Sequence, residues 1–287
     1  MGLPPERIGP PPRNVPLMLA AQVSLGGAVS QLGWLFFGFG SIFFWLFAWQ
    51  ADLTGWRFRE GNIGTTAGQS LGCRDTHYSV GGSRGSRGTP VYENRYRYEV
   101  DGSALTGKSY ETGNCVAGGQ VTVEYLLAQP GYSRIQGMRR RLLSPWAALA
   151  TIFPGVGLAV AIVGLRQGRR RIRLLRDGLT AAGRVVSKVP TSAKVMGRVV
   201  YKVTVEFSSR DGAVRRATTS TNRPEVLGDE PTETVLYDPD DPANAAALDS
   251  MPGNVVVDEG GGLRAAGSRA FLILPVASVL VNAWFLR

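Results

Sequence analysis

The sequence predicts a protein of membrane α-helices plus all-β modules: three transmembrane helices with two small antiparallel β-sandwich or β-barrel modules. Two observations predict this class. Three long runs of the 287-residue chain carry no charged residue, and roughly 20 apolar residues in a helix span the ~30 Å hydrocarbon layer of a bilayer. The polar regions between these runs alternate apolar and charged residues with a period of two, which is typical of half-buried strands.

The first uncharged run, Asn14–Ala51, is longer than one crossing needs. We expect residues 1–30 to form an N-terminal tail and an interfacial or loosely packed segment, which is broken at Gly26-Gly27. The crossing helix is predicted at 31–49, with tryptophans toward its ends at the depth of the lipid headgroups. The run is too long for the apolar part of a cleaved signal peptide, so we expect an uncleaved anchor.

Two further uncharged runs predict two further transmembrane helices, at 144–165 and 270–286. Pro154 lies inside the first of them, and because proline removes a backbone donor we expect a kink there. A re-entrant hairpin is the alternative, although each half would have only about ten residues. Core helices of a soluble protein can have similar sequences, and that alternative stays open.

Arginines on both sides of the second predicted span indicate its orientation. Arg139–Arg141 precede it, and a richer, topology-setting group follows it: Arg166, Arg169, Arg170, Arg171, Arg173 and Arg176. Cytoplasmic flanks carry the excess of Lys and Arg, which favours the second polar region inside the cell and the first outside. We expect 166–179 to be a basic juxtamembrane helix that ends at Gly178 in the left-handed conformation typical of C′ glycines.

The formal net charge of +10 and the pI of about 10.0 raise the question of a nucleic-acid partner. The arginines cluster beside the spans, however, where membrane topology and anionic headgroups account for them. The basic motif with interleaved aromatic residues that is typical of RNA-binding proteins is missing from the sequence. The sequence therefore predicts the lipid bilayer as a partner and no nucleic acid.

Two polar regions, 53–141 and 180–250, are predicted to be β modules, and 251–269 is predicted to be a linker. They share three motifs in the same order at an offset of about 112–115 residues with one small length change in between, which indicates a duplication. The matching pairs are Ala67-Gly68 with Ala182-Gly183, Thr76 with Thr191, Arg95–Gly102 with Tyr201–Gly212, and Val123-Glu124-Tyr125 with Val235-Leu236-Tyr237. In both copies a strand with alternating pattern precedes an Asp-Gly pair, which predicts a tight hairpin.

The two cysteines, Cys73 and Cys115, both lie in the first module. If this module faces outward, a disulfide between them is permitted by the compartment and would contribute ~2–4 kcal/mol. Two unpaired buried thiols are the alternative, and the sequence leaves both open.

Residues for catalysis or metal binding are scarce. His77 is the single histidine, which excludes His-paired nucleophiles and multi-histidine metal sites, and we expect it in a turn or on the surface. The aspartates near Pro239 favour a rigid turn over a calcium site, and Gly81–Gly88 favours a flexible loop over a phosphate cradle. The sequence therefore predicts a non-enzymatic protein without cofactor or metal.

The second module resembles a known family. Leu174–Gly178, Ala182–Ser187, Tyr201–Phe207 and Val235–Pro242 are similar to the bacterial membrane protein family with the domain of unknown function numbered three-five-nine-two. The likeness covers about 174–250 well and the first module more loosely, because the first module has Tyr125-Leu126-Leu127 in place of the Tyr-Asp-Pro turn. The resemblance implies membrane attachment and β-rich modules between spans, and it implies no activity and no functional residues.

Together these patterns favour a multi-pass protein of the bacterial cytoplasmic (inner) membrane that acts as an envelope scaffold or interaction protein, with an unidentified envelope protein as a possible partner. Two alternatives remain. One is an accessory subunit of a membrane enzyme or transport complex. The other is an envelope sensor that couples the outer module to the inner one. The sequence leaves the oligomeric state open.

Overall fold

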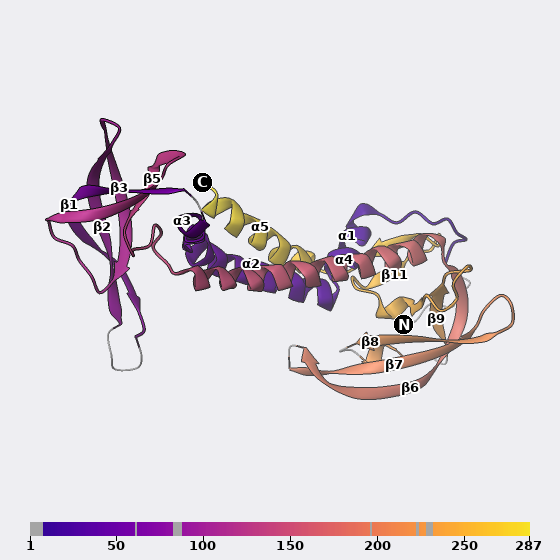
Figure 1. Cartoon of the computed structure of the whole chain (residues 1–287). Helices are drawn as coiled ribbons and strands as arrows, with labels where there is room; N and C mark the ends of the chain where they lie inside the picture. The colour runs from indigo at the N-terminus through magenta and orange to yellow at the C-terminus, as the bar shows by residue number, and fades with distance from the viewer. Residues whose placement is uncertain (1–7, 61, 83–87, 196, 222–223, 228–231) are drawn as a thin grey trace. The chain divides into compact units, whose positions relative to one another are not determined.

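The computed structural model describes residues 8–60, 62–82, 88–195, 197–221, 224–227 and 232–287; Figure 1 traces the chain. The start of the predicted N-terminal tail and the centre of the Gly81–Gly88 loop lie outside these residues. The chain divides into two compact units, which are described separately here. Unit 1 comprises Met1–Phe39 and Pro154–Arg287, and unit 2 comprises Gly40–Phe153.

The α-helices are α1 Leu17–Leu25, α2 Ala28–Leu46, α3 Arg57–Glu60, α4 Ile152–Asp177 and α5 Ile273–Phe285. Short 3₁₀ helices lie at η2 Ala48–Gln50, η3 Pro145–Thr151, η4 Pro224–Val226, η5 Leu248–Ser250 and η6 Arg269–Leu272. Two helical stretches are long and apolar enough to cross a membrane, Ala28–Gln50 and Pro145–Asp177, whereas Arg269–Phe285 is apolar but shorter. Two of the three predicted crossings therefore coincide with helices of sufficient length.

Within unit 1, small residues bring α2 and α4 into close antiparallel contact. A Cβ atom at Gly164 would lie 2.5 Å from the Cα of Ser30, and Cβ atoms at Gly33 and Gly157 would overlap backbone atoms of the facing helix. Glycine stripes of this kind let helix backbones approach closely. Helix α5 packs against α2 as well, because the Ser278 hydroxyl donates to the Trp34 carbonyl at 2.9 Å.

Two details of α4 differ from the prediction. Pro154 is the third residue of α4 and follows directly on the 3₁₀ turn of η3, so its missing N–H belongs to the first helical turn and breaks no bond in the helix interior. Gly178 ends the helix as expected but lacks a positive φ. Glycine is required there by space, because a Cβ atom would lie 2.5 Å from the Leu174 carbonyl oxygen.

Helix α1 buries one face, while Leu17 and Met18 are exposed. Leu19 and Val23 are fully enclosed in a hydrophobic core with the last turn of α4, where Leu174 and Leu175 are buried. The same core includes Met251 and residues of the hairpin β11 Val255–Val257 and β12 Leu263–Ala265, within the predicted linker. The expected break at Gly26-Gly27 separates α1 from α2.

The first module is one antiparallel sheet of five strands in the order β3-β2-β1-β4-β5. Its strands are β1 Ile63–Val80, β2 Thr89–Val100, β3 Ser103–Thr112, β4 Gln120–Leu126 and β5 Gln129–Ile135. The edge strands β3 and β5 contact one another, so the sheet is curled. Tyr96 and Tyr98 are buried inside it, whereas Arg97 and Glu99 are exposed, as the period of two predicts.

The second module repeats this topology in the order β10-β9-β6-β7-β8. Its strands are β6 Leu179–Val195, β7 Arg198–Ser208, β8 Val214–Thr221, β9 Glu233–Tyr237 and β10 Ala245–Ala247. Strands β8 and β10 are in contact, and Val203, Val205 and Phe207 of β7 lie in the core. Two five-stranded antiparallel sheets thus agree with the all-β prediction for both modules.

The irregularities of the two long first strands also match. Strand β1 departs from regular pairing between Ser70 and Gly72 and again between Asp75 and Ser79. Strand β6 departs from it at the positions 115 residues further on, between Val185 and Ser187 and between Pro190 and Lys194. Thr76 and Thr191, in the second irregularity of each strand, both donate from the hydroxyl to a carbonyl of the neighbouring strand, at 2.6 and 2.7 Å.

Candidate functional site

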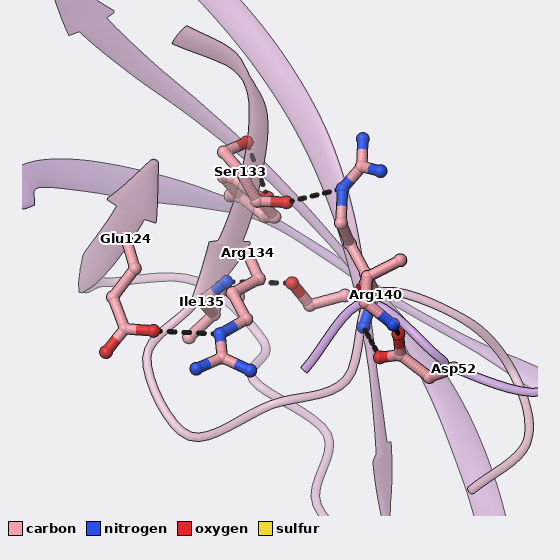
Figure 2. Close-up of polar contacts among 9 residues, drawn as sticks. Asp52, Glu124, Ser133, Arg134, Ile135 and Arg140 are labelled. Atoms are coloured by element: carbon pink, nitrogen blue, oxygen red, sulfur yellow. Dashed lines mark hydrogen bonds and ion pairs between the residues drawn. The ribbon is translucent and has the colours of Figure 1, made fainter. Parts of the chain in front are cut away.

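In unit 2, polar contacts connect the segment that follows η2 with the segment that precedes η3. We call this set of contacts, centred on Asp52, the polar joint. Asp52 is 4% exposed, and its carboxylate accepts hydrogen bonds from the Arg140 N–H at 2.7 Å and from the Thr54 N–H at 3.0 Å (Figure 2). The Asp52 N–H in turn donates to the Leu143 carbonyl at 2.9 Å. These hydrogen bonds therefore connect two segments that are far apart in the sequence.

The Asp52 carboxylate is ionised in this setting. Burial disfavours the charged form, but hydrogen bonds from the Thr54 side chain and from the backbone N–H groups of Arg140, Thr54 and Arg141 outweigh it and hold the pKa of Asp52 below its usual range. All these donors hold the carboxylate in place. It is therefore suited to a structural role rather than to accepting a substrate proton.

Arginines and aromatic rings continue the joint. The Arg140 guanidinium lies 3.5 Å from the ring centre of Tyr132 and donates to the Ser133 carbonyl at 3.1 Å. Arg134 lies 4.4 Å from the ring centre of Phe58 and forms an ion pair of 2.8 Å with Glu124 (Figure 2). Such stacked guanidinium groups are held in fixed orientations. The joint is a rigid connection with its carboxylates already engaged.

Cys73 and Cys115 are joined by a disulfide, with their Cα atoms 5.6 Å apart. The bond ties the middle of β1 to the loop between β3 and β4. Close by, the hydroxyl of Ser70 donates to the Val116 carbonyl at 2.7 Å, and the Val116 N–H donates to the side-chain oxygen of Asn94 at 2.8 Å. The loop is thus fixed to the sheet by covalent and polar contacts together.

The arginines that follow the second span lie on α4. Arg166, Arg169, Arg170 and Arg173 recur at the spacing of one helix face, and all four are exposed. None of them has a hydrogen bond or an ion pair with another residue in the described part of the chain. We call these four residues the arginine face. Arg171 lies off it, half-buried beside Gly27.

Arg176 is the exception in the predicted group, because it forms an ion pair of 2.9 Å with Asp177. Arg13, which the sequence did not single out as a site residue, binds the C-terminal end of α4. Its buried guanidinium donates to the carbonyl oxygens of Gly178 at 2.7 Å and Leu175 at 3.2 Å. Nothing in the local sequence marks Arg13, because the contact joins residues far apart in the chain.

The outer face of the first sheet carries two open, adjoining grooves, of about 520 and 320 Å³. Ala67 and Gln120 line both grooves, and Ala67 and Ala104 are small exposed residues, which leaves these surfaces hollow. Arg97 lies in the wall of the larger groove without an ion pair to any residue that the structure describes. The grooves are shallow and polar, as at a surface that contacts another molecule rather than one that encloses a substrate.

The other candidate residues lie at the second irregularity of β1, where His77 is exposed, and in the turn after β9. His77 has φ 62° and its N–H donates to the Asp75 carboxylate at 2.8 Å. Asp238 accepts from the Asp240 N–H at 3.1 Å in the turn after β9. Among the residues with described placement, no group of three or more His, Cys, Asp or Glu side chains is arranged to hold a metal ion.

Comparisons with known proteins give no match. No family model, no curated protein and no solved structure matches it. The likeness to the three-five-nine-two family therefore rests on the quoted motifs alone.

Proposed function

We propose that this chain is a multi-pass protein of the bacterial cytoplasmic membrane, with a non-enzymatic role as an envelope scaffold or interaction protein. One observation carries the proposal. The most apolar windows of the two long helices are only 22% buried, and large side chains such as Leu35, Phe36 and Phe39 are exposed. A core helix of a soluble protein would bury such a surface, whereas lipid covers it in a bilayer.

Three crossings place the two modules on opposite sides of the membrane in this proposal. The third crossing is α5 with η6, whose exposed apolar residues include Ile273, Val279 and Leu280. The arginine-rich end of α4 lies in the cytoplasm, with the second module beyond it. The first module with its disulfide lies outside, in a compartment where disulfides persist.

We also propose that the two modules arose by duplication. Their equal strand order and the irregularities 115 residues apart support this origin, because bulges are specific features rather than expected consequences of pairing. The surfaces have diverged. Arg97 has no ion-pair partner among the described residues, while Glu206 at the corresponding place on β7 pairs with Arg216 at 3.1 Å. The open grooves of the first module favour contacts with an envelope molecule there.

Extraction tests the membrane proposal. Membranes from cells that express the full chain are washed with alkaline carbonate and then with a neutral detergent. We expect the protein to remain in the carbonate pellet and to enter solution in detergent. A protein that stays dispersed as a monomer in buffer without detergent or lipid would refute the proposal. A pull-down in the same detergent separates the roles, because a stoichiometric enzyme partner would favour an accessory subunit.

A further inference from the structure

The exposed surface of α4 changes character at one point along its length. Val156, Ile162 and Val163 are exposed and apolar. From Arg166 onward the exposed positions of the same helix carry the arginine face. In a bilayer, a helix surface changes in this way where hydrocarbon gives way to headgroups. This step rests on the proposed membrane location.

The start of α2 and the 3₁₀ helix η6, both in unit 1, lie near the point on α4 where the arginine face begins. The close contact of Gly164 with Ser30 brings the first turn of α2 to within one turn of Arg166. The Gln31 side chain donates to the Phe271 carbonyl at 2.8 Å, which brings η6 and the exposed Arg269 to this end as well. Cations from two segments therefore gather where the apolar surface ends.

Among the described residues, no ion pair neutralises the arginine face, although Asp177 attracts Arg173 electrostatically. Helix α4 has no acidic residue before Asp177, which pairs with Arg176, and α1 and α2 have none. From Arg166 to Arg173 the helix rises about 10 Å, comparable to the headgroup layer of roughly 5–8 Å on each side of a bilayer together with the reach of the side chains. Guanidinium groups match phosphate oxygens in charge and in fork geometry.

We propose that the arginine face binds the phosphate groups of anionic phospholipids in the leaflet that surrounds this end of α4. The lipid chains lie along the exposed apolar residues of the same helix, and the phosphodiester lies against Arg166, Arg169, Arg170 and Arg173. A free phosphate would gain the ionic contacts alone. A phospholipid gains the apolar contact as well, and this combination favours the lipid as the ligand.

Lipid retention tests this binding. The full chain is purified in neutral detergent with equal amounts of phosphatidylglycerol and phosphatidylcholine that have the same acyl chains, and retained lipid is counted by native mass spectrometry. We expect a preference for phosphatidylglycerol that falls on the order of tenfold when Arg166, Arg169, Arg170 and Arg173 are all changed to Gln. The preference should also weaken with added salt.

A matched variant controls for net charge. Changing Arg74, Arg184, Arg198 and Arg210 to Gln also removes four exposed arginines, from the β modules. This variant should keep the preference, and glycerol phosphate should not displace the lipid. An equal loss in both variants, displacement by glycerol phosphate, or a preference that survives without the arginine face would overturn the inference.

The wild type separates this inference from the proposed function. If the wild-type protein needs detergent but shows no lipid preference, the binding inference alone fails. If it needs no detergent, the membrane proposal itself fails. Gel filtration and an intact Cys73–Cys115 disulfide establish that the variants are folded.

Discussion

Asp52 is the first charged residue after the long uncharged run, and its carboxylate is fully engaged with Thr54 and Arg140. We predict that Asp52→Asn lowers the free energy of unfolding of unit 2 by about 1–3 kcal/mol, because the new amide group turns a donor toward backbone N–H groups that need an acceptor. Chemical denaturation in detergent, followed by near-ultraviolet circular dichroism, measures the loss. Glu99→Gln, at an exposed position, should change little.

The same carboxylate predicts a pH dependence. Its pKa is lower in the folded protein than in the unfolded chain. The stabilisation is therefore complete above the unfolded value of about 3.9 and is lost as the pH falls through the lower folded value. We expect the unfolding midpoint of unit 2 to fall with acidification below about pH 4, and to fall less steeply in Asp52→Asn. Parallel pH profiles of the two proteins would contradict this assignment.

Arg13 supplies a cation to the C-terminal end of α4, where the last carbonyl groups lack helical partners. We predict that Arg13→Gln destabilises this end by about 1.5–3 kcal/mol, as expected for hydrogen bonds to a charged group. Amide hydrogen exchange should speed up in a peptide that covers Leu174–Gly178. Arg184→Gln removes an exposed arginine and should leave that peptide unchanged.

At the scale of elements, glycines decide how α2 and α4 pack. Gly157 faces the backbone of Phe37, whereas a Cβ at Gly155, in the same helix, would meet nothing within 4 Å. We predict that Gly157→Val costs at least about 1–3 kcal/mol through overpacking and that Gly155→Val costs far less. The helix propensity change is the same in both, so the difference isolates the packing. Thermal unfolding midpoints in detergent measure it, and equal midpoints would contradict the close approach.

The elements themselves were largely predictable. Period-two alternation identified Tyr96 and Tyr98 as buried, and Asp101-Gly102 forms the expected hairpin turn with φ values of 50° and 74°. Local sequence could not reveal that Pro154 lies in a first helical turn, because the helix start depends on the preceding 3₁₀ segment. It also could not reveal the curling of each sheet, since that depends on contacts between strands such as β3 and β5.

At the scale of the whole molecule, the sequence predicted two β modules and apolar helices but not the joints between them. The hydrophobic pattern of α1 suggested an interfacial segment, since it has no charged residue. The burial of one of its faces became evident only through partners such as Leu175 and Met251, which lie more than a hundred residues away. The joint at Asp52 escaped prediction for the same reason. Asp52 and its partner Arg140 are 88 residues apart in the sequence, with the strands of the first module between them.

The position of the modules relative to the membrane gives the last prediction. The disulfide between Cys73 and Cys115 fits an oxidising compartment for the first module, and the arginines of α4 fit a cytoplasmic second module. Ser79 and Ser192 are exposed serines of β1 and β6. In a chain with Cys73→Ser and Cys115→Ser, we expect Ser79→Cys to react with a membrane-impermeant maleimide in spheroplasts with an intact cytoplasmic membrane. Ser192→Cys should react only after that membrane is permeabilised, because the second module then faces the reagent for the first time. The reverse pattern would invert the topology, and labelling of both before permeabilisation would mean that α4, the one predicted crossing between the two modules, does not cross the membrane.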